Sequence, residues 1–482
     1  MSNVRTRFAP SPTGFMHVGN LRTALYAWLL ARSRQGKFIL RIEDTDQARY
    51  VENAVEVIYA TLRSAGLEHD EGPDKDGGVG PYIQSERKAL YREYAEKLVE
   101  SGHAYYCFCD KCESSDDDES IHEASELCPC STLDTAVAAA RVAVGDAHVI
   151  RQRIDRSRST TFTDTVFGEI TIENKVLDDQ ILLKRDNMPT YNFANVIDDH
   201  LMGITHVVRG SEYLSSTPKY NLLYQAFNWD IPEYVHLPLI MGRDAEGNVS
   251  KLSKRHGSVS FENLVAEGYL PEAIVNYIAL LGWSPKSDRE IFSLDELAEA
   301  FKVSGLNKAP AVFDYAKLRW MNSEYLKLLA PEKFAAIAKP FAAVENTPLE
   351  AVWDKIASLL HSRVEVLTEC AEKIAFFKEL PEYDVTLFNH KKSKSDPESA
   401  KADLPELRGL LEALPVWDAG NISATLTAFA ENKGVKSGKP MWQVRIAVSG
   451  CAVTPGGPGE IMEILGKEES LRRIDAAIAK LS

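Results

Sequence analysis

The first 45 residues alternate short extended runs with one long amphipathic stretch. Residues 4–9 and 38–42 have the apolar character of short strands, and residues 18–34 between them carry apolar side chains at helical spacing. This order of strand, helix and strand predicts a parallel sheet, with ligands expected beyond the carboxyl ends of its strands.

The apolar pattern predicts further elements along the chain. Up to residue 257 it predicts helices at 51–65, 84–101 and 217–227, strands at 148–154, 169–174, 206–210 and 237–241, and a polar loop at 242–257. From residue 261 the pattern is almost wholly helical. It includes a capping box at Ser293 and Glu296, amphipathic stretches at 332–343, 351–378 and 405–413, and a basic loop at 391–401.

Length and composition narrow the class of protein. A chain of 482 residues is too long for one hydrophobic core and suggests two to four domains, and 45% hydrophobic with 26% charged residues is typical of a soluble globular protein. Because it has no apolar run of about 18 residues and no basic-then-apolar N-terminus, we expect neither a membrane span nor a secretory signal. The net charge of −15 argues against indiscriminate binding to nucleic acid, but local basic clusters decide specific contacts.

Five of the seven cysteines lie between positions 107 and 130. This crowding favours a reducing compartment, the cytoplasm, over a disulfide scaffold. Two Cys-x-Cys pairs can supply four thiolates to a tetrahedral structural Zn²⁺, and Cys112 is a fifth candidate; the pairs are Cys107 with Cys109 and Cys128 with Cys130. A metal-free loop of reduced thiols remains the alternative.

Two loops have the residues needed to handle phosphate groups. In the first, residues 10–20, Gly14 allows a tight turn, Gly19 allows close approach to the backbone, and His17 can donate a hydrogen bond at a helix start. The second, residues 247–257, gathers Lys251, Lys254 and further polar groups between glycines, and such cations can close over a polyphosphate. Taken singly, the first is as easily a helix cap and the second a solvated basic loop.

Together the two loops resemble the signature motifs of class I aminoacyl-tRNA synthetases. His17-Val-Gly-Asn20 resembles the HIGH motif, and Lys251-Leu-Ser-Lys-Arg255 resembles the KMSKS motif, in the same order and structural setting. Asn20 replaces the usual His and Arg255 the usual Ser, which glutamate- and glutamine-specific members tolerate.

Longer motifs resemble bacterial glutamyl-tRNA synthetases and span about two-thirds of the chain. They begin at Arg7 (RFAPSPTG), Arg41 (RIEDTD), Pro189 (PTYNFANVIDDH), His206 (HVVRGSE) and Phe313 (FDYAKLRWMN). The resemblance implies an α/β fold with a Rossmann-type parallel-sheet catalytic domain at 1–104 and 190–260. It also implies an inserted acceptor-end-binding domain at 105–189, a stem-contact helical domain at 261–325, and an all-helical anticodon-binding domain at 326–482.

The same resemblance implies an ATP-dependent reaction in two steps. Glutamate is first converted to glutamyl-adenylate, and the glutamyl group then passes to the terminal adenosine of glutamate tRNA, with Mg²⁺ as counter-charge and the enzyme as a monomer. The implied catalytic residues are His17, Gly19, Lys251 and Lys254, and the implied ATP-binding residues are His17, Gly19, Asn20, Ser253 and Lys254. The implied glutamate-binding residues are Arg7, Ser11, Glu43, Tyr191, Asn195 and Arg209.

Alternatives remain open at this stage. For Arg41 with Glu43, and for Arg209 with Glu212, plain structural ion pairing is an equally simple interpretation. An enzyme of relaxed specificity would also charge glutamine tRNA, and a catalytically silent tRNA-binding paralogue would charge neither. Glutaminyl enzymes generally end in β-barrels, and a shortened relative that glutamylates a modified tRNA base lacks the last third, so the helical C-terminal pattern weakens both.

Overall fold

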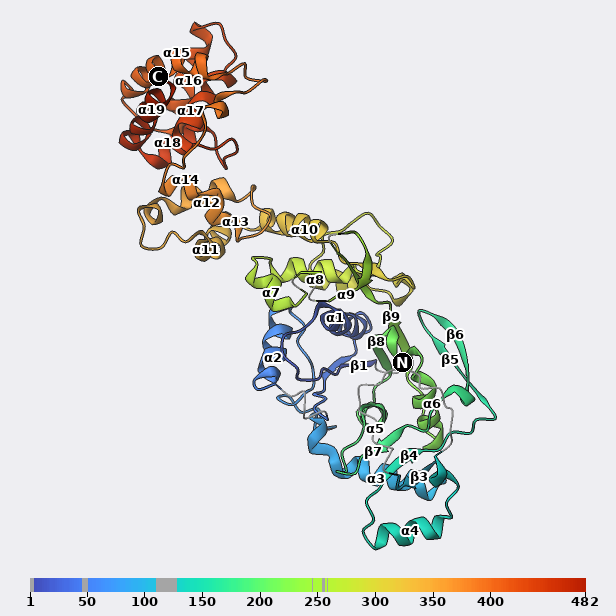
Figure 1. Ribbon diagram of the computed structural model, residues 1–482. Helices are drawn as coiled ribbons and strands as arrows, with labels where there is room; N and C mark the ends of the chain where they lie inside the picture. The colour runs from blue at the N-terminus through green and yellow to red at the C-terminus, as the bar shows by residue number, and fades with distance from the viewer. Residues whose placement is uncertain (1–3, 46–50, 110–127, 245, 254–255, 258) are drawn as a thin grey trace. The chain divides into compact units, whose positions relative to one another are not determined.

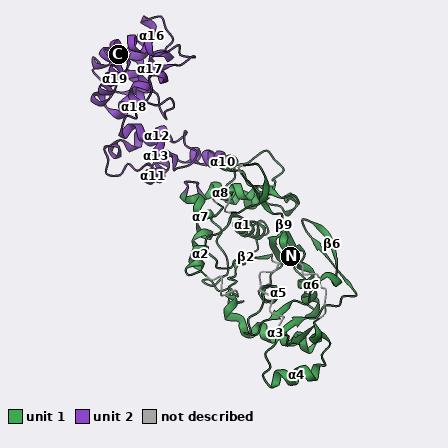
Figure 2. Cartoon of the chain, in the orientation of Figure 1, with its two compact units in different colours: residues 1–266, 271–318 green, residues 267–270, 319–482 purple. Residues whose placement is uncertain are grey.

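The computed structural model describes residues 4–45, 51–109, 128–244, 246–253, 256–257 and 259–482. The chain forms two compact units, residues 1–266 with 271–318 and residues 267–270 with 319–482 (Figure 2). Lys254, Arg255 and Cys112 therefore lie outside the described residues. No helix of the described ranges is long and apolar enough to cross a membrane.

The first unit begins with a βαβ arrangement (Figure 1). Strand β1 pairs in parallel with β2, and α1 connects them with Leu21, Leu25 and Leu29 fully buried. The bounds of the first elements are β1 (Arg5–Phe8), α1 (Val18–Ser33), β2 (Lys37–Leu40), α2 (Ala54–Ser64) and α3 (Lys88–Glu100). The predicted βαβ start is thus confirmed: α1 buries its apolar side chains against β1 and β2 on one side and against later helices on another.

The parallel sheet continues after an inserted segment. The insertion forms an antiparallel sheet in the order β3-β4-β7, while a mixed sheet has the order β6-β5-β9-β8, with β8 and β9 parallel. The Thr205 N–H donates to Arg5 O at 3.0 Å and so links the start of β8 to β1. The bounds are β3 (Ala104–Cys107), α4 (Thr135–Ala143), β4 (Val149–Gln152), β5 (Ser159–Asp164), β6 (Gly168–Glu173), β7 (Ile181–Leu183), α5 (Tyr191–Leu201), β8 (His206–Gly210), α6 (Thr217–Ala226) and β9 (Glu233–Leu237).

A small sheet and several helices complete the first unit. Strand β10 pairs with β11 on one side and β12 on the other. The predicted capping box is confirmed, because the Ser293 hydroxyl accepts from the Glu296 N–H while the Glu296 carboxylate accepts from the Ser293 N–H. The bounds are β10 (Ile240–Arg243), β11 (Val249–Lys251), α7 (Phe261–Ala266), α8 (Pro271–Ala279), α9 (Leu294–Ala300), β12 (Ala311–Val312) and α10 (Tyr315–Leu328), which runs on into the second unit.

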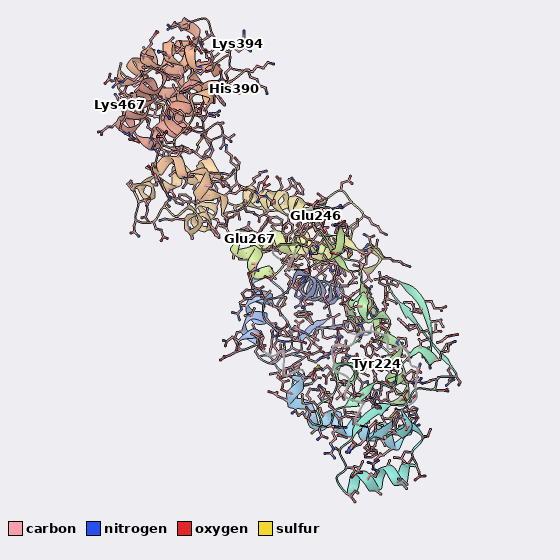
Figure 3. The ribbon with its side chains drawn as sticks, viewed as in Figure 1. Tyr224, Glu246, Glu267, His390, Lys394 and Lys467 are labelled. Atoms are coloured by element: carbon pink, nitrogen blue, oxygen red, sulfur yellow. The ribbon has the colours of Figure 1, made fainter. Side chains whose placement is uncertain are left out.

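The described part of the second unit is helical. Its bounds are α11 (Pro331–Ala342), α12 (Trp353–Leu360), α13 (Glu369–Lys373), α14 (Ala375–Lys378), α15 (Pro397–Glu412), α16 (Ala419–Asn432), α17 (Gly438–Ser449), α18 (Pro458–Leu465) and α19 (Lys467–Leu481). Outside the helices, His390 and Lys394 belong to a turn (labelled in Figure 3), and the His390 ring stacks on Trp442 with ring centroids 3.9 Å apart. The α/β fold with a helical C-terminal part is confirmed.

Four predicted elements are wrong in detail. The polar loop predicted at 242–257 contains β11, because the chain turns back there and pairs with β10. A single strand at 237–241 does not form, because β9 ends and β10 begins on either side of Pro238, which has no N–H for a ladder. A continuous helix at 351–378 is broken, since the Leu367 N–H donates to Gly268 O instead of to its own turn. The predicted loop at 391–401 ends early, because Asp396 caps α15 at Pro397.

Candidate active site

His17 stands at the N-terminus of α1, where its side chain caps the helix. Its Nδ1 accepts a hydrogen bond from the Gly19 N–H at 3.0 Å, so a neutral ring carries its proton on Nε2. Burial first, and then the charge of Lys251, lower the pKa of His17. A Cβ at position 19 would lie 3.2 Å from Nδ1, which favours glycine there. The cap therefore uses one ring nitrogen and leaves a neutral Nε2–H donor.

The two phosphate-type loops lie beside one another. Val18 N–H donates to Val259 O at 2.8 Å, and Phe261 N–H donates to Met16 O at 3.1 Å, so the start of α1 pairs with the segment that follows the lysine loop. Glu262 strengthens this junction, since its carboxylate accepts from the Met16 N–H at 3.1 Å and from the Thr61 hydroxyl. Loops separated by about 240 residues in sequence thus meet at the N-terminus of one helix.

The lysine loop is organised by His256. The Ser253 N–H donates to His256 Nδ1 at 3.0 Å, and Ser250 Oγ lies 3.1 Å from Nε2, so the ring joins both ends of the turn. A Cβ at Gly242 would come within 2.5 Å of this ring, which explains the glycine on β10. Lys251, the last residue of β11, is close enough to His17 to lower its pKa.

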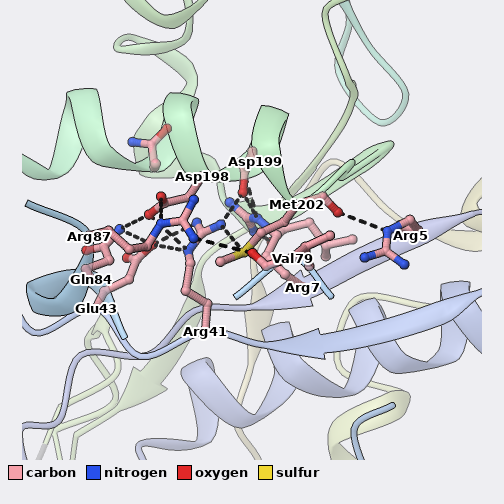
Figure 4. Close-up of polar contacts among 12 residues, drawn as sticks. Arg5, Arg7, Arg41, Glu43, Val79, Gln84, Arg87, Asp198, Asp199 and Met202 are labelled. Carbon is pink, nitrogen blue, oxygen red and sulfur yellow. Dashed lines mark hydrogen bonds and ion pairs between the residues drawn. The ribbon is translucent and has the colours of Figure 1, made fainter. Parts of the chain in front are cut away.

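A cluster of buried arginines and carboxylates lies at the carboxyl ends of β1 and β2 (Figure 4). Arg41 is fully buried and donates to Asp199 at 2.7 Å and to Glu43 at 2.9 Å. Arg7 donates to the same Asp199 at 3.0 Å and to Val208 O at 3.3 Å. Burial alone would raise the pKa of Asp199, but Arg7 and Arg41 outweigh it and lower that pKa. The ion-pair interpretation of Arg41 with Glu43 is confirmed.

The neighbouring carboxylate, Asp198, completes this cluster. It accepts from Arg87 at 2.7 Å, from Gln84 at 2.8 Å and from the Tyr91 hydroxyl at 2.9 Å. Each buried charge thereby has an opposite charge and further donors around it, as buried ions require. This half of the cluster fixes α5 against α3 and the turn that precedes it, Gln84–Arg87.

Arg209, the fourth residue of β8, has different surroundings. Its Nε donates to His236 Nε2 at 3.0 Å and its Nη2 to the Thr217 hydroxyl at 2.8 Å. Among the described residues no carboxylate pairs with this buried guanidinium, and its Nη1 has no hydrogen-bond partner. Tyrosine rings surround it, with centroids 4.6–5.3 Å from Cζ; they are Tyr213, Tyr220 and Tyr234. The ion pair of Arg209 with Glu212 is therefore absent from the described contacts.

Tyr191 joins the two arginine environments. Burial raises the pKa of Tyr191 most, and the neighbouring Tyr213 and Glu43 raise it further. The charges of Arg209 and Arg7 oppose this rise, but the pKa remains well above its ordinary value. The Tyr191 ring lies 5.5 Å from that of Tyr213, which lies 5.3 Å from Arg209 Cζ. Arg7 and Glu43 are linked to each other through Asp199 and Arg41.

The other two residues predicted to bind glutamate differ from this group. Asn195 is buried one turn after Tyr191 on α5, and its amide donates to Tyr191 O at 2.8 Å. Ser11 is exposed, and no described contact of its side chain joins it to the group.

Four residues of this region were missed in the sequence: Asp164, Asp199, Thr217 and His236. Asp199 had a usable signal, because two adjacent acids directly follow the apolar residues Val196 and Ile197 in α5. His236 interrupts an apolar strand in the same way, since it is fully buried within β9. Asp164 and Thr217 gave no comparable signal, because both residue types are common at strand ends and helix starts.

The four predicted cysteine ligands converge in the insertion. The Sγ atoms of Cys107, Cys109, Cys128 and Cys130 all lie within 4.8 Å of one another, with the closest contacts at 3.4–3.5 Å. Thiolates around a tetrahedral Zn²⁺ with bonds near 2.3 Å are about 3.8 Å apart, so the spacing fits this ion. Burial first, and then the neighbouring thiols, raise the pKa of Cys109, a cost that a bound cation removes.

Comparisons with known proteins agree with this geometry. Residues 3–320 match the family model described as tRNA synthetases class I (E and Q), catalytic domain, and residues 333–478 match an anticodon binding domain. A protein of Clostridium botulinum named glutamate–tRNA ligase is 54% identical over 486 residues, covering 100% of this chain and 99% of that protein. A protein of Clostridium tetani with the same name is 51% identical, covering 100% and 98%.

A solved structure extends the likeness to three dimensions. The crystal structure of a glutamate tRNA ligase from Elizabethkingia meningosepticum, in complex with its amino acid, is 36% identical, covers 100% of both chains and has a TM-score of 0.87. The agreement of both domain models, the full-length relatives and this fold leaves one family. The chain belongs to the glutamate–tRNA ligases of the class I tRNA synthetases.

Proposed function

We propose that this chain joins glutamate to glutamate tRNA at the expense of ATP, through the site formed by its two phosphate-type loops and the Arg209 pocket. The observation that carries the proposal is that the start of α1, capped by His17, pairs with the segment that follows the lysine loop, while Arg7 of β1 contacts Val208, the neighbour of Arg209 on β8. Anions that react with one another, a carboxylate and a polyphosphate, need such adjacent cationic subsites.

The amino-acid subsite is formed by groups with complementary charges. Arg209 has an open Nη1 and no carboxylate partner among the described residues. A substrate carboxylate would accept from Nη1 and supply the missing counter-charge. We assign Arg7 to the other carboxylate and Glu43 to the ammonium group. Tyr191, Asn195 and Ser11 supply hydrogen bonds, Ser11 from an exposed loop that needs to close on the substrate.

The phosphate subsite acts by charge stabilisation. ATP enters as its Mg²⁺ complex and is held by His17, Gly19, Asn20, Ser253 and Lys254. The glutamate α-carboxylate attacks the α-phosphorus, the bond to the β-phosphate oxygen breaks, and pyrophosphate leaves with the negative charge. His17 Nε2–H, Lys251 and Lys254 stabilise the developing charge, so no enzyme nucleophile is needed.

The second step uses the adenylate. A ribose hydroxyl of the terminal adenosine of tRNA attacks the glutamyl carbonyl, the bond to the phosphate breaks, and AMP leaves. We propose that the inserted segment, residues 105–189, binds the acceptor end and that the C-terminal helices, residues 326–482, bind the anticodon. The catalytic domain would comprise residues 1–104 and 190–260, and the stem-contact domain residues 261–325. The enzyme acts as a monomer in the cytoplasm, where its cluster of cysteines stays reduced.

The two alternatives receive no support from the comparisons. The relatives carry the name glutamate–tRNA ligase, which does not favour a double specificity for glutamine tRNA. A silent paralogue has no need of a poised Nε2–H donor at His17 beside Lys251. Aminoacylation of separate glutamate and glutamine tRNAs distinguishes all three: product with the first tRNA alone supports the proposal, and product with neither defeats it.

The phosphate subsite is tested by Lys254→Ala. The variant is expected to lower the turnover of glutamate activation by about 10²-fold or more, comparable to the loss of an oxyanion-type donor. Lys302→Ala, which removes an exposed lysine of the same unit, is the matched control and retains wild-type turnover. Near-normal turnover of the Lys254 variant removes this residue from the mechanism.

The cysteine cluster is proposed to hold one structural Zn²⁺. Its role would be to fix the junction of β3 with the segment from Cys128 to Cys130, not to take part in catalysis. Protein purified without chelator or affinity metal is expected to contain about one zinc per chain by elemental analysis. Cys128→Ser should lose most of it, while Cys451→Ser, a cysteine outside the cluster, should not. A zinc content near zero in the wild type would contradict the proposal.

A further inference from the structure

A buried hydrogen-bonded chain leads from the hairpin of β5 and β6 to Arg209. Asp164 at the end of β5 accepts from His236 Nδ1 at 2.7 Å and from the His236 N–H at 3.0 Å. His236 on β9 in turn accepts from Arg209 Nε at 3.0 Å through its Nε2. His236 is fully buried and Asp164 is 1% exposed, so water does not compete for these contacts.

The directions of these hydrogen bonds are fixed by the protons available. Arg209 Nε–H can only donate, so His236 Nε2 must be the unprotonated nitrogen and Nδ1 must carry the proton. Asp164 is the group that enforces this tautomer, because its carboxylate can only accept. Its other oxygen accepts from the Val166 and Phe167 N–H groups at 2.9 and 2.7 Å, which holds the carboxylate in place.

Thr217 supplies a second fixed acceptor. Its hydroxyl donates to Tyr213 O at 2.8 Å, so it accepts from Arg209 Nη2. A planar guanidinium held at two nitrogens has no remaining freedom to rotate, and its third nitrogen, Nη1, has one direction in which to point. The orientation of the open donor is thus set by His236 and Thr217, and not by any ion pair of Arg209.

We infer that His236, held in one tautomer by Asp164, is a positioning residue that aims Arg209 Nη1 at a carboxylate of the bound glutamate. The inference rests on the proposed role of Arg209 and adds two residues for which the sequence motifs gave no role. It also gives a reason for the buried carboxylate of Asp164, at the turn between β5 and β6, to lie against His236.

The electrostatics of the chain agree with this role. Burial lowers the pKa of His236 most, and the charge of Arg209 lowers it further. The hydrogen bond to Asp164 opposes both, and the pKa is about 4. The ring therefore stays a neutral acceptor at physiological pH. A direct carboxylate partner for Arg209 would neutralise its charge, whereas a neutral imidazole orients the guanidinium and leaves its full charge for the substrate.

Two substitutions of similar size separate positioning from simple packing. In His236→Gln the amide oxygen reaches the place of Nε2 and can accept from Arg209, while in His236→Asn it reaches only the place of Nδ1. We expect His236→Asn to raise the KM for glutamate by about tenfold or more, because a charge-assisted hydrogen bond is lost. His236→Gln should recover most of this loss, and the KM for ATP should stay within about twofold in both.

A double substitution shows whether His236 acts through Arg209. Arg209→Ala alone should raise the KM for glutamate, and adding His236→Asn to it should raise that KM no further. Val235→Ala, a buried neighbour on β9 without polar atoms, is the control for strand packing and should leave the KM for glutamate unchanged.

The outcomes separate the two claims. If Arg209→Ala raises the KM for glutamate while His236→Asn does not, or if the Gln and Asn variants behave alike, the positioning role is overturned and the role of Arg209 stands. Should Arg209→Ala leave that KM unchanged, the proposed glutamate subsite itself is wrong.

Discussion

Arg41 and Arg209 are both buried at the ends of strands in the same unit, and their surroundings are opposite. Every nitrogen of Arg41 donates to a carboxylate, either Glu43 or Asp199. Arg209 donates to a neutral imidazole and a hydroxyl, has tyrosine rings around it, and keeps one nitrogen without a partner among the described residues.

The difference shows which buried cation holds the fold and which awaits a ligand. An arginine such as Arg41, whose three nitrogens all donate to carboxylates, has its charge satisfied within the protein and no donor left for an anion. A buried guanidinium with neutral neighbours has no counter-charge, so its desolvation is unfavourable. A bound carboxylate would offset that desolvation free energy. Sequence motifs cannot make this distinction, since both arginines stand in similar strand-end contexts.

The largest expected effect comes from breaking the paired arginine. Arg41→Met should lower the free energy of unfolding by about 3–5 kcal/mol, because it leaves Glu43 and Asp199 buried with less counter-charge. Arg209→Met is the matched control in the absence of glutamate and should lower this free energy by about 1–2 kcal/mol, since only the neutral acceptors His236 and Thr217 lose a donor. Urea denaturation of both variants provides the comparison, and equal destabilisation would contradict it.

A smaller effect, dependent on pH, is expected at a second paired arginine. Glu71 accepts from both Nη atoms of Arg5 at 2.8 and 2.9 Å and from Lys37 at 2.8 Å. The hydrogen bonds from Arg5 lower the pKa of Glu71 most. Burial opposes them, but with the further contribution of Lys37 the pKa falls from 4.5 to about 2. A lowered folded-state pKa stabilises the fold above pH 4.5, and this contribution is lost as pH falls toward 2.

Glu71→Gln measures that contribution. The wild type should exceed the variant in free energy of unfolding by about 2–3 kcal/mol at neutral pH. The difference should shrink below pH 4.5 and vanish near pH 2. A difference that does not depend on pH would mean that the pairing of Arg5 is not electrostatic.

Much of the fold could be predicted because the responsible signals are local. The apolar face of 18–33 and the buried run of β2 define the βαβ start, and Ser293 with Glu296 defines a helix start. The break after Leu360 could not be predicted, because it depends on a hydrogen bond from Leu367 to Gly268, about 100 residues away.

Site residues could be proposed from the sequence where chemistry is concentrated in short segments. His17 with Gly19, and Lys251 with Lys254, stand in compact loops, and the four cysteines stand in two pairs. The partners of Arg209 could not be found in this way, because Asp164 and His236 are 72 residues apart and meet only through the pairing of β5 with β9. What a motif cannot convey is whether its arginine is already neutralised.

The most direct test of the central claim is the affinity for glutamate measured by calorimetric titration. Arg209→Met should weaken glutamate binding by about 100-fold or more, because the buried cation that awaits a carboxylate is removed. Folding of the variant is checked by the same urea denaturation. Glutamate binding to Arg209→Met with the affinity of the wild type would contradict the claim that the open guanidinium is the carboxylate subsite.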